Sequence, residues 1–193
     1  MIPTVAIFVA LLQSQASNAE LGYRFALPAG FEPFAEARAS SPDLVDCWRE
    51  ATPVSTQGAL VLCVQRMHGE LGREAMRPEQ VPATAQSVSF RWKDFDIQGL
   101  RSLVSQDGKQ VFVLVTQVPL RHEAVQLTLA GPADQEARGR TLMAATLASL
   151  AGDTNWLTGR ERSERLGRAA GPWIGIALAV IAVVWWRKRR AAA

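Results

Sequence analysis

The feature that most constrains this chain is an uncharged apolar run near its end. Residues 169–186 read AAGPWIGIALAVIAVVWW, and four basic residues follow directly. About 18 residues with a rise of ~1.5 Å each form a helix of roughly 27 Å, which is long enough to cross the hydrocarbon core of a bilayer. The run therefore predicts a single transmembrane helix, and the alternative is a helix buried in a protein core.

The residues at both ends of this run favour the membrane. Indole rings prefer the membrane interface, and tryptophans stand at Trp173, Trp185 and Trp186. Basic residues stay on the cytoplasmic side, and the basic cluster consists of Arg187, Lys188, Arg189 and Arg190. The sequence therefore predicts a single-pass membrane protein with a cytoplasmic tail at 187–193 and an extracytoplasmic N-terminal domain, either periplasmic or at the cell surface.

One face of the predicted helix carries small residues. Gly171, Gly175 and Ala179 recur every four residues, and small side chains at that spacing let two membrane helices approach closely. We expect this face to pack on a partner helix or to support self-association. The alternative is that Gly and Ala are simply common in membrane helices.

The N-terminus carries a shorter apolar run. Residues 2–12 are too few to span a bilayer, and they lead into small residues. Ser17 and Ala19 fit the −3 and −1 positions of a cleavage site after Ala19. The sequence therefore predicts a signal peptide over residues 1–19. Because the segment before the apolar run lacks Lys and Arg, a first core strand is the alternative.

The charge distribution argues against a nucleic-acid partner. The chain has 21 Lys and Arg and 18 Asp and Glu, and four of the basic residues belong to the C-terminal cluster. The rest is therefore close to neutral, whereas a nucleic-acid-binding domain needs a basic face. We expect the lipid bilayer and an envelope protein as partners, and no cofactor.

Cys47 and Cys63 are the only cysteines of the chain. The segments around them, 44–48 and 59–64, have the pattern of strands, and the residues between favour a turn. In a hairpin centred near Ser55 the two cysteines face each other, and export permits a disulfide. The alternative is two free thiols that pack as small apolar side chains.

The remaining pattern predicts an α+β domain over residues 20–152, followed by a charged spacer at 153–168. Apolar alternation predicts strands near 23–27, 87–93, 96–106, 111–115 and 124–129. Asp107-Gly108 predicts a hairpin turn, and the near-continuous apolar run 111–115 predicts a strand buried on both faces. We therefore expect a mostly antiparallel sheet with one long C-terminal helix packed on it, followed by a single transmembrane helix.

The predicted domain opens on Tyr23–Phe31 (YRFALPAGF), and its last strand, Val125–Pro132 (VQLTLAGP), leads into the helix. In these segments and in its order of elements the chain resembles the Mog1/PsbP-like superfamily of small α+β domains. The resemblance covers about residues 20–152. It implies the fold of that superfamily and an accessory or binding role, and it carries over no catalytic residue.

The titratable residues form no catalytic motif. His68 and His122 are the only histidines, and neither has the spacing of a metal site. Asp94 and Asp96 flank a turn and could act as an acid–base pair or as calcium ligands, although a solvated turn explains them as well.

Our first hypothesis is therefore a non-enzymatic, membrane-anchored extracytoplasmic accessory domain that acts on an envelope partner or a small ligand. The alternative is a membrane-tethered hydrolase with one histidine as its base. A third hypothesis is that the C-terminal segment is a sorting signal, although no LPxTG motif precedes it.

Overall fold

The computed structural model describes residues 14–73, 83–106, 108–157 and 161. The chain divides into two units, Met1–Asn155 and Trp156–Ala193. The elements below all belong to the first unit.

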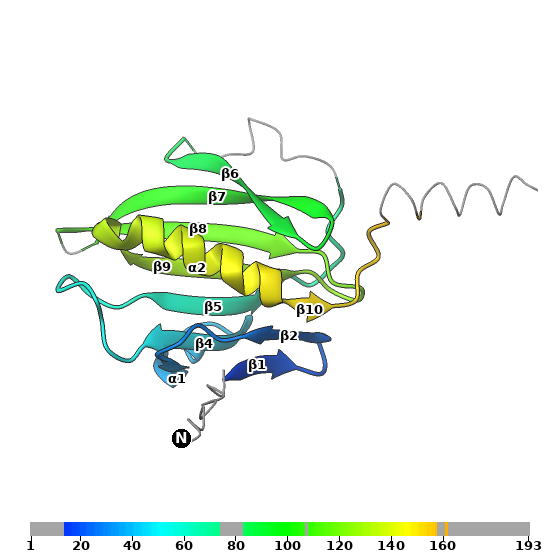
Figure 1. The fold of residues 1–193 in the computed structure, drawn as a ribbon, viewed down its shortest axis with the longest axis horizontal. Helices are drawn as coiled ribbons and strands as arrows, with labels where there is room; N and C mark the ends of the chain where they lie inside the picture. Colours follow the sequence, from blue (N-terminus) through cyan, green and yellow to red (C-terminus); the bar gives the residue numbers. More distant parts are fainter. Residues whose placement is uncertain (1–13, 74–82, 107, 158–160, 162–193) are drawn as a thin grey trace, which may run out of the picture. The chain divides into compact units, whose positions relative to one another are not determined.

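A seven-stranded antiparallel sheet forms the centre of this unit (Figure 1). In spatial order its strands are β3 (Phe31–Pro33), β4 (Leu44–Glu50), β5 (Val61–Arg66), β9 (Val125–Pro132), β8 (Lys109–Val118), β7 (Phe95–Gln106) and β6 (Ala85–Trp92). The turn between β7 and β8 contains Gly108 at φ +75°, a conformation that glycine adopts without a steric penalty. The predicted hairpin at this position is confirmed.

A smaller sheet has the spatial order β1 (Gln15–Asn18), β2 (Tyr23–Ala26) and β10 (Ala151–Gly152). Its middle strand turns Tyr23 and Phe25 into the core, where Phe25 meets Trp48 of β4 edge to face with ring centroids 5.6 Å apart. Aromatic side chains therefore join the small sheet to the large one.

Helix α2 (Glu136–Ser149), which follows the 3-10 turn η2 (Ala133–Gln135), lies across one face of the large sheet (Figure 1). Its Gly139 packs directly on β8, because a Cβ there would lie 2.4 Å from the ring of Phe112. Met143 and Leu147 of the helix are fully buried. A second short helix, α1 (Ala35–Arg38), follows β3. The core therefore lies between α2 and one face of the large sheet.

The expected fold class is wrong in its helical part. The antiparallel sheet is present, but its helix is short, with 14 residues. It ends because Leu150 adopts an extended backbone and the chain then pairs with β2 as β10. Among the described residues, no helix has both the length and the apolar character needed to cross a membrane.

The same finding contradicts the expected single-pass membrane localisation. The segment on which it rested, residues 169–186, lies outside the described residues. The same is true of its interfacial tryptophans, its small-residue face and the basic tail at 187–193.

The segment expected to be a signal peptide contributes a strand to the fold. Residues 15–18 form β1, in which Ala16 is buried. The N–H of Leu27 donates to the carbonyl of Ser14 at 2.8 Å. Cleavage after Ala19 would remove this strand, and residues 1–13 lie outside the described part of the chain.

Candidate functional site

The face of the large sheet that points away from α2 carries a distinct set of half-buried side chains. Side chains alternate along a strand, so the neighbours of the buried core residues point to this second face. The strand register places Val61, Ala130, Val113 and Ser102 in one row across β5, β9, β8 and β7. The next row holds Cys63, Thr128, Val115 and Leu100. We call this surface, which also includes Val104 and Val111, the valine face.

The burial of β8 differs from the expectation that both of its faces are buried. The apolar run Val111–Val115 predicted a strand buried on both faces, but only Phe112 and Leu114 are fully buried. Val111, Val113 and Val115 are half-buried. The strand is apolar on both sides, although α2 covers one side alone.

The valine face changes from apolar to polar along its strands. Beyond the two rows, Gln65, Gln126 and Gln117 form a third row of amides. The Nε2 of Gln126 donates to Oε1 of Gln65 at 3.2 Å and to Oγ1 of Thr128 at 3.4 Å. None of these three rows contains a charged side chain.

Ion pairs border the valine face on its two outer sides. Glu32 of β3 accepts from Nε of Arg49 at 3.1 Å, and Asp96 of β7 accepts from Arg91 of β6 at 3.4 Å. Arg49 also lies over the ring of Phe34, 5.0 Å from its centroid. The centre of the face is therefore uncharged, and its charged neighbours are paired.

The cysteines lie at the β4 side of the valine face. Cys47 and Cys63 are directly opposite in the register, their Cα atoms are 4.2 Å apart, and they form a disulfide. The N–H of Phe34 donates to the carbonyl of Cys47 at 2.8 Å. Cys47 is buried, whereas Cys63 is half-buried at the edge of the exposed surface.

An apolar pocket of about 230 Å³ lies at one end of the valine face. Val61, Val111 and Ala130 contribute to its lining, together with Gln57–Ala59 and the end of the β7–β8 hairpin. Lys109 of that hairpin donates from Nζ to the carbonyl of Gln57 at 3.3 Å. The pocket is smaller than the roughly 300–1,000 Å³ of typical small-molecule sites, and its size suits one apolar side chain.

Two polar anchors hold the loop that borders the pocket. Ser55 donates to the carboxylate of Asp134 at 2.9 Å and accepts from the N–H of Gln57 at 3.1 Å. At the start of the same loop, the buried carboxylate of Glu50 accepts from Arg138 of α2 at 2.6 Å. The rim of the pocket is therefore fixed by contacts to η2 and α2.

The electrostatics of Glu50 follow from these contacts. Burial raises the pKa of the Glu50 carboxyl, but the hydrogen bond and charge of Arg138 lower it. The backbone N–H groups of Leu60 and Val54 lower it further, and the pKa lies below its ordinary value. Glu50 is therefore a charged structural anchor near neutral pH.

The histidines and the acidic pair lie away from the pocket. Nε2 of the exposed His68 lies 2.8 Å from the carboxylate of Asp43, and His122 is exposed in the loop between β8 and β9. Asp94 lies in the β6–β7 turn. Among the described residues, no group of three or more His, Cys, Asp or Glu side chains is arranged to hold a metal ion.

Sequence reasoning missed the valine face and the Glu50–Arg138 pair. Apolar alternation indicates that a residue faces one side of a sheet, but it does not say which side a helix will cover. The sequence feature that could have indicated the valine face is the uncharged residue at every second position of β8 and β9. The ion pair joins residues 88 positions apart, and no local pattern links them.

No protein-family model and no curated protein matches the chain. Among solved structures, a protein from Bacteroides thetaiotaomicron is 13% identical with a TM-score of 0.47, and the match covers 69% of this chain but only 46% of that one. LpqN of Mycobacterium tuberculosis, described as involved in cell envelope biogenesis, is 12% identical with a TM-score of 0.44 over 74% of this chain and 86% of LpqN.

The third similar structure is the cyanobacterial PsbP protein CyanoP from Synechocystis sp. PCC 6803. It is 15% identical with a TM-score of 0.42, over 72% of this chain and 91% of CyanoP. At these identities and TM-scores the likeness carries no argument about function, which has to come from the site.

Proposed function

We propose that this protein is a non-enzymatic accessory domain of extracytoplasmic type, which binds a partner protein through the valine face. The observation that carries the proposal is a half-exposed sheet face whose central rows are uncharged and which ends in a largely apolar pocket of about 230 Å³. Buried centres of protein interfaces are depleted of charge and surrounded by polar residues.

The disulfide between Cys47 and Cys63 supports an extracytoplasmic location, because cytosolic thiols are kept reduced.

We infer the chemistry of the partner from the pocket. Interfaces depend on a few anchor side chains that fill fully desolvated pockets, and this pocket is framed by Val61, Val111 and Ala130. We expect the partner to insert one large apolar residue there and to lay uncharged residues over the valines. The row of glutamines then offers amide groups to the partner's backbone.

Two neighbouring residues of β7 allow a matched test. Val104 pairs with Val111 and lies on the valine face, whereas Leu103 pairs with Phe112 and lies on the opposite face. Their exposures are nearly equal, 41% and 39%. A photo-crosslinking amino acid is placed at either position in cells of the native host, and the products are identified by mass spectrometry.

A crosslink to another protein from position 104 and none from position 103 supports the proposal. A crosslink to a second copy of this chain, or equal products from both positions, overturns it. Once the partner is identified, Val104→Glu should weaken its binding at least tenfold, because the substitution places an unpaired charge in an apolar interface. Leu103→Glu should leave the affinity unchanged.

The non-enzymatic part of the proposal has its own test. The purified chain, His68→Ala and His122→Ala are assayed on activated esters and amides. A hydrolase with a histidine base would lose about 10²-fold or more in one variant. Turnover that depends on either histidine would establish the alternative function, and background rates in all three proteins support the binding role.

A further inference from the structure

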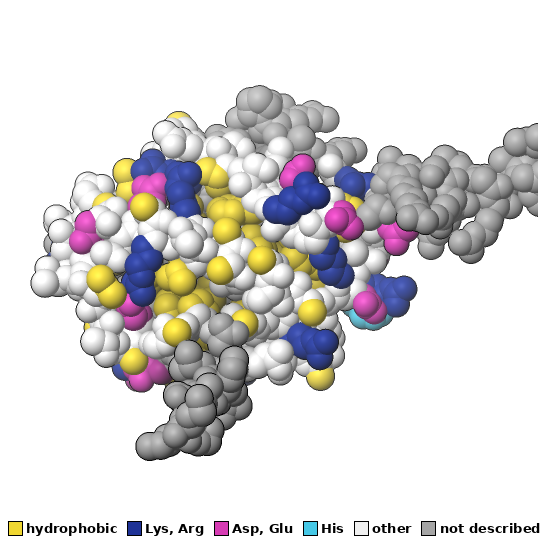
Figure 2. Space-filling model, in the orientation of Figure 1, with side chains coloured by type: hydrophobic (Ala, Val, Ile, Leu, Met, Phe, Trp, Pro, Cys, Tyr) yellow, Lys and Arg dark blue, Asp and Glu magenta, His cyan; other side chains and the backbone are white. Residues whose placement is uncertain are grey.

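A second concavity lies at the end of the molecule opposite to the pocket of the valine face. It has a volume of about 730 Å³ and is formed by the β1–β2 turn, by β10, and by residues of two other loops. In Figure 2, Lys and Arg side chains stand on the part of the surface formed by β2 and β10. A volume of this size is within the range of small-molecule sites.

Arg24 is part of the groove lining. It belongs to β2, the central strand of the small sheet, and it pairs directly with Ser17 of β1 on one side and Ala151 of β10 on the other. Its neighbours Tyr23 and Phe25 are buried, so Arg24 points to the outer face. Among the described residues, Arg24 has no carboxylate partner within ion-pair distance.

Lys93 supplies a second cation at the groove wall. It lies in the two-residue turn between β6 and β7 at φ +52°, a strained conformation for a residue with a Cβ. Its Nζ donates to the carbonyl of Gly152 and lies 4.9 Å from the centroid of the Trp92 ring. The ammonium group is therefore held beside β10, which forms part of the groove.

The adjacent wall is formed by Arg121 and His122. The backbone N–H of Arg121 donates to the carbonyl of Asp153 at 2.9 Å, which fixes this loop against the chain after β10. The guanidinium of Arg121 lies 3.6 Å from the Asp153 carboxylate, and both side chains are largely exposed. An ion pair of this kind is weak and can be exchanged for a ligand.

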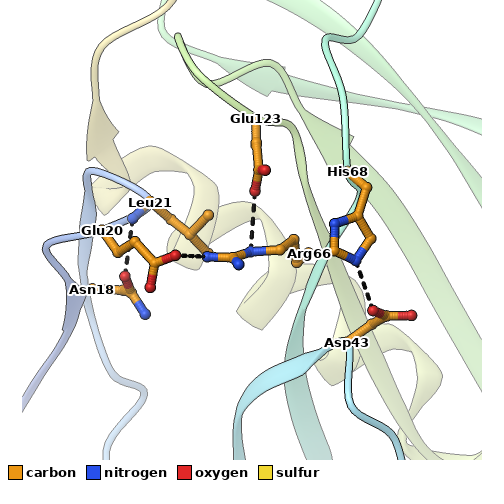
Figure 3. Close-up of polar contacts among 7 residues, drawn as sticks. All are labelled: Asn18, Glu20, Leu21, Asp43, Arg66, His68 and Glu123. Carbon is orange, nitrogen blue, oxygen red and sulfur yellow. Dashed lines mark hydrogen bonds and ion pairs between the residues drawn. The ribbon is translucent and has the colours of Figure 1, made fainter.

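The acidic residue of the β1–β2 turn is ion-paired. Glu20 accepts a hydrogen bond from Arg66, which lies outside the groove lining and is also 3.0 Å from the carboxylate of Glu123 (Figure 3). The turn itself is held by the N–H of Leu21, which donates to Oδ1 of Asn18 at 3.0 Å. Because Arg66 is shared by two carboxylates, it offsets Glu20 only in part. The groove lining holds the cations Arg24, Lys93 and Arg121 against the carboxylates of Glu20 and Asp153, so it keeps an excess of positive charge.

We propose that this groove binds a small organic anion, whose carboxylate or phosphate group lies on Arg24 and is flanked by Lys93. A guanidinium can donate two parallel N–H groups to a carboxylate or to a phosphate. These bidentate contacts are among the strong charge-assisted hydrogen bonds of proteins. The exposed Arg121 and His122 then contact the remainder of the ligand. This site is independent of the valine face, because it lies at the other end of the sheets.

The test is a titration of the full chain with inorganic phosphate and with succinate, followed by NMR. We expect at least one anion to shift the Nε–H signal of Arg24 and the amide signals of Gly22 and Gly152, with millimolar affinity that falls as salt rises. Phosphate and succinate distinguish the two oxyanion chemistries. No saturable shift with either anion would overturn the proposal.

Three variants assign the binding to Arg24. Arg24→Gln should weaken the anion at least tenfold, and Arg24→Lys should weaken it less, since it keeps the charge but loses the second N–H group. Arg91→Gln is the matched control, because Arg91 is also an exposed strand arginine but lies outside the groove. Equal affinity in Arg24→Gln and the wild type, with both folded, would also overturn the proposal.

Discussion

Glu50 is a buried carboxylate whose charge is held by a guanidinium from another element. Its side chain is 5% exposed, and Arg138 of α2 donates to it at 2.6 Å. The Arg138 side chain is itself 35% exposed. Removing Arg138 would leave the buried carboxylate without its charged partner, and solvent at the site would offset part of that cost. At the residue scale, this contact fixes both the position of α2 and the start of the loop at the pocket.

We therefore expect Arg138→Ala to lower the free energy of unfolding by about 2 kcal/mol. Arg140→Ala is the control, because Arg140 makes an exposed i,i+4 pair with Glu136 and should cost no more than ~0.5 kcal/mol. Urea denaturation at pH 7 measures both. Equal losses in the two variants would show that Glu50 does not depend on Arg138.

The same residue predicts a pH dependence. The pKa of the Glu50 carboxyl lies below its ordinary value of 4.5 in the folded protein. A carboxyl with a lowered folded pKa contributes stability above the unfolded pKa, and that contribution is lost as pH falls through the folded pKa. The protein should therefore lose stability below pH 4.5.

Glu50→Gln should flatten this acid slope, since the amide does not titrate. Glu32→Gln provides the control, because Glu32 forms an exposed pair with Arg49. The measurement is the free energy of unfolding from urea titrations between neutral pH and about pH 3. A slope in Glu50→Gln as steep as that of the control would contradict the assignment.

At the scale of elements, the disulfide joins two strands that are already paired. Cys47 and Cys63 are 16 residues apart in sequence and directly opposite in the β4–β5 register. The strand pairing positions the cysteines, and the bond then limits the unfolded chain. The disulfide should therefore increase the free energy of unfolding and leave the architecture of the sheet unchanged.

We expect the double variant Cys47→Ala, Cys63→Ala to keep the native circular dichroism spectrum and to lose about 3 kcal/mol of stability in the chain-entropy model. A reducing agent should lower the urea midpoint of the wild type by a similar amount and leave that of the variant unchanged. A wild-type midpoint that is insensitive to reduction would favour the free-thiol alternative.

At the scale of the whole molecule, the question is where the folded unit begins. β1 closes the outer side of the small sheet and also forms part of the anion groove through Ser17 and Asn18. A mature chain that began at Glu20 would lack this strand. Arg24 would then lie on an edge strand of the small sheet and not on its central strand.

Two adjacent substitutions test whether β1 belongs to the mature fold. Ala16 is buried and Ser17 is exposed. If β1 is retained, Ala16→Glu should cost about 2 kcal/mol or more, because it buries an unpaired charge, and Ser17→Glu should cost little. Thermal denaturation together with the intact mass of the mature protein measures this. Loss of residues 1–19 would make both substitutions silent and support the signal peptide.

Much of the antiparallel sheet could be predicted because strand signals are local. Alternation in Val125–Leu129, a turn at Gly108 and the spacing of the cysteines all depend on near neighbours in the chain. The length of the helix could not be predicted as well, because Leu150 leaves the helix and the two residues after it, Ala151 and Gly152, pair with β2. That pairing joins the two ends of the domain.

From the sequence alone came most strands of the large sheet, the β7–β8 hairpin and the opposition of the two cysteines, because these depend on side-chain alternation and turn chemistry within short segments. Only the tertiary structure decided which side of the sheet α2 covers, and hence that Val113 and its neighbours form a half-exposed face. It also placed Arg24, Lys93 and Arg121 around one groove. Burial and charge balance are set by contacts between distant segments, and a local pattern does not contain them.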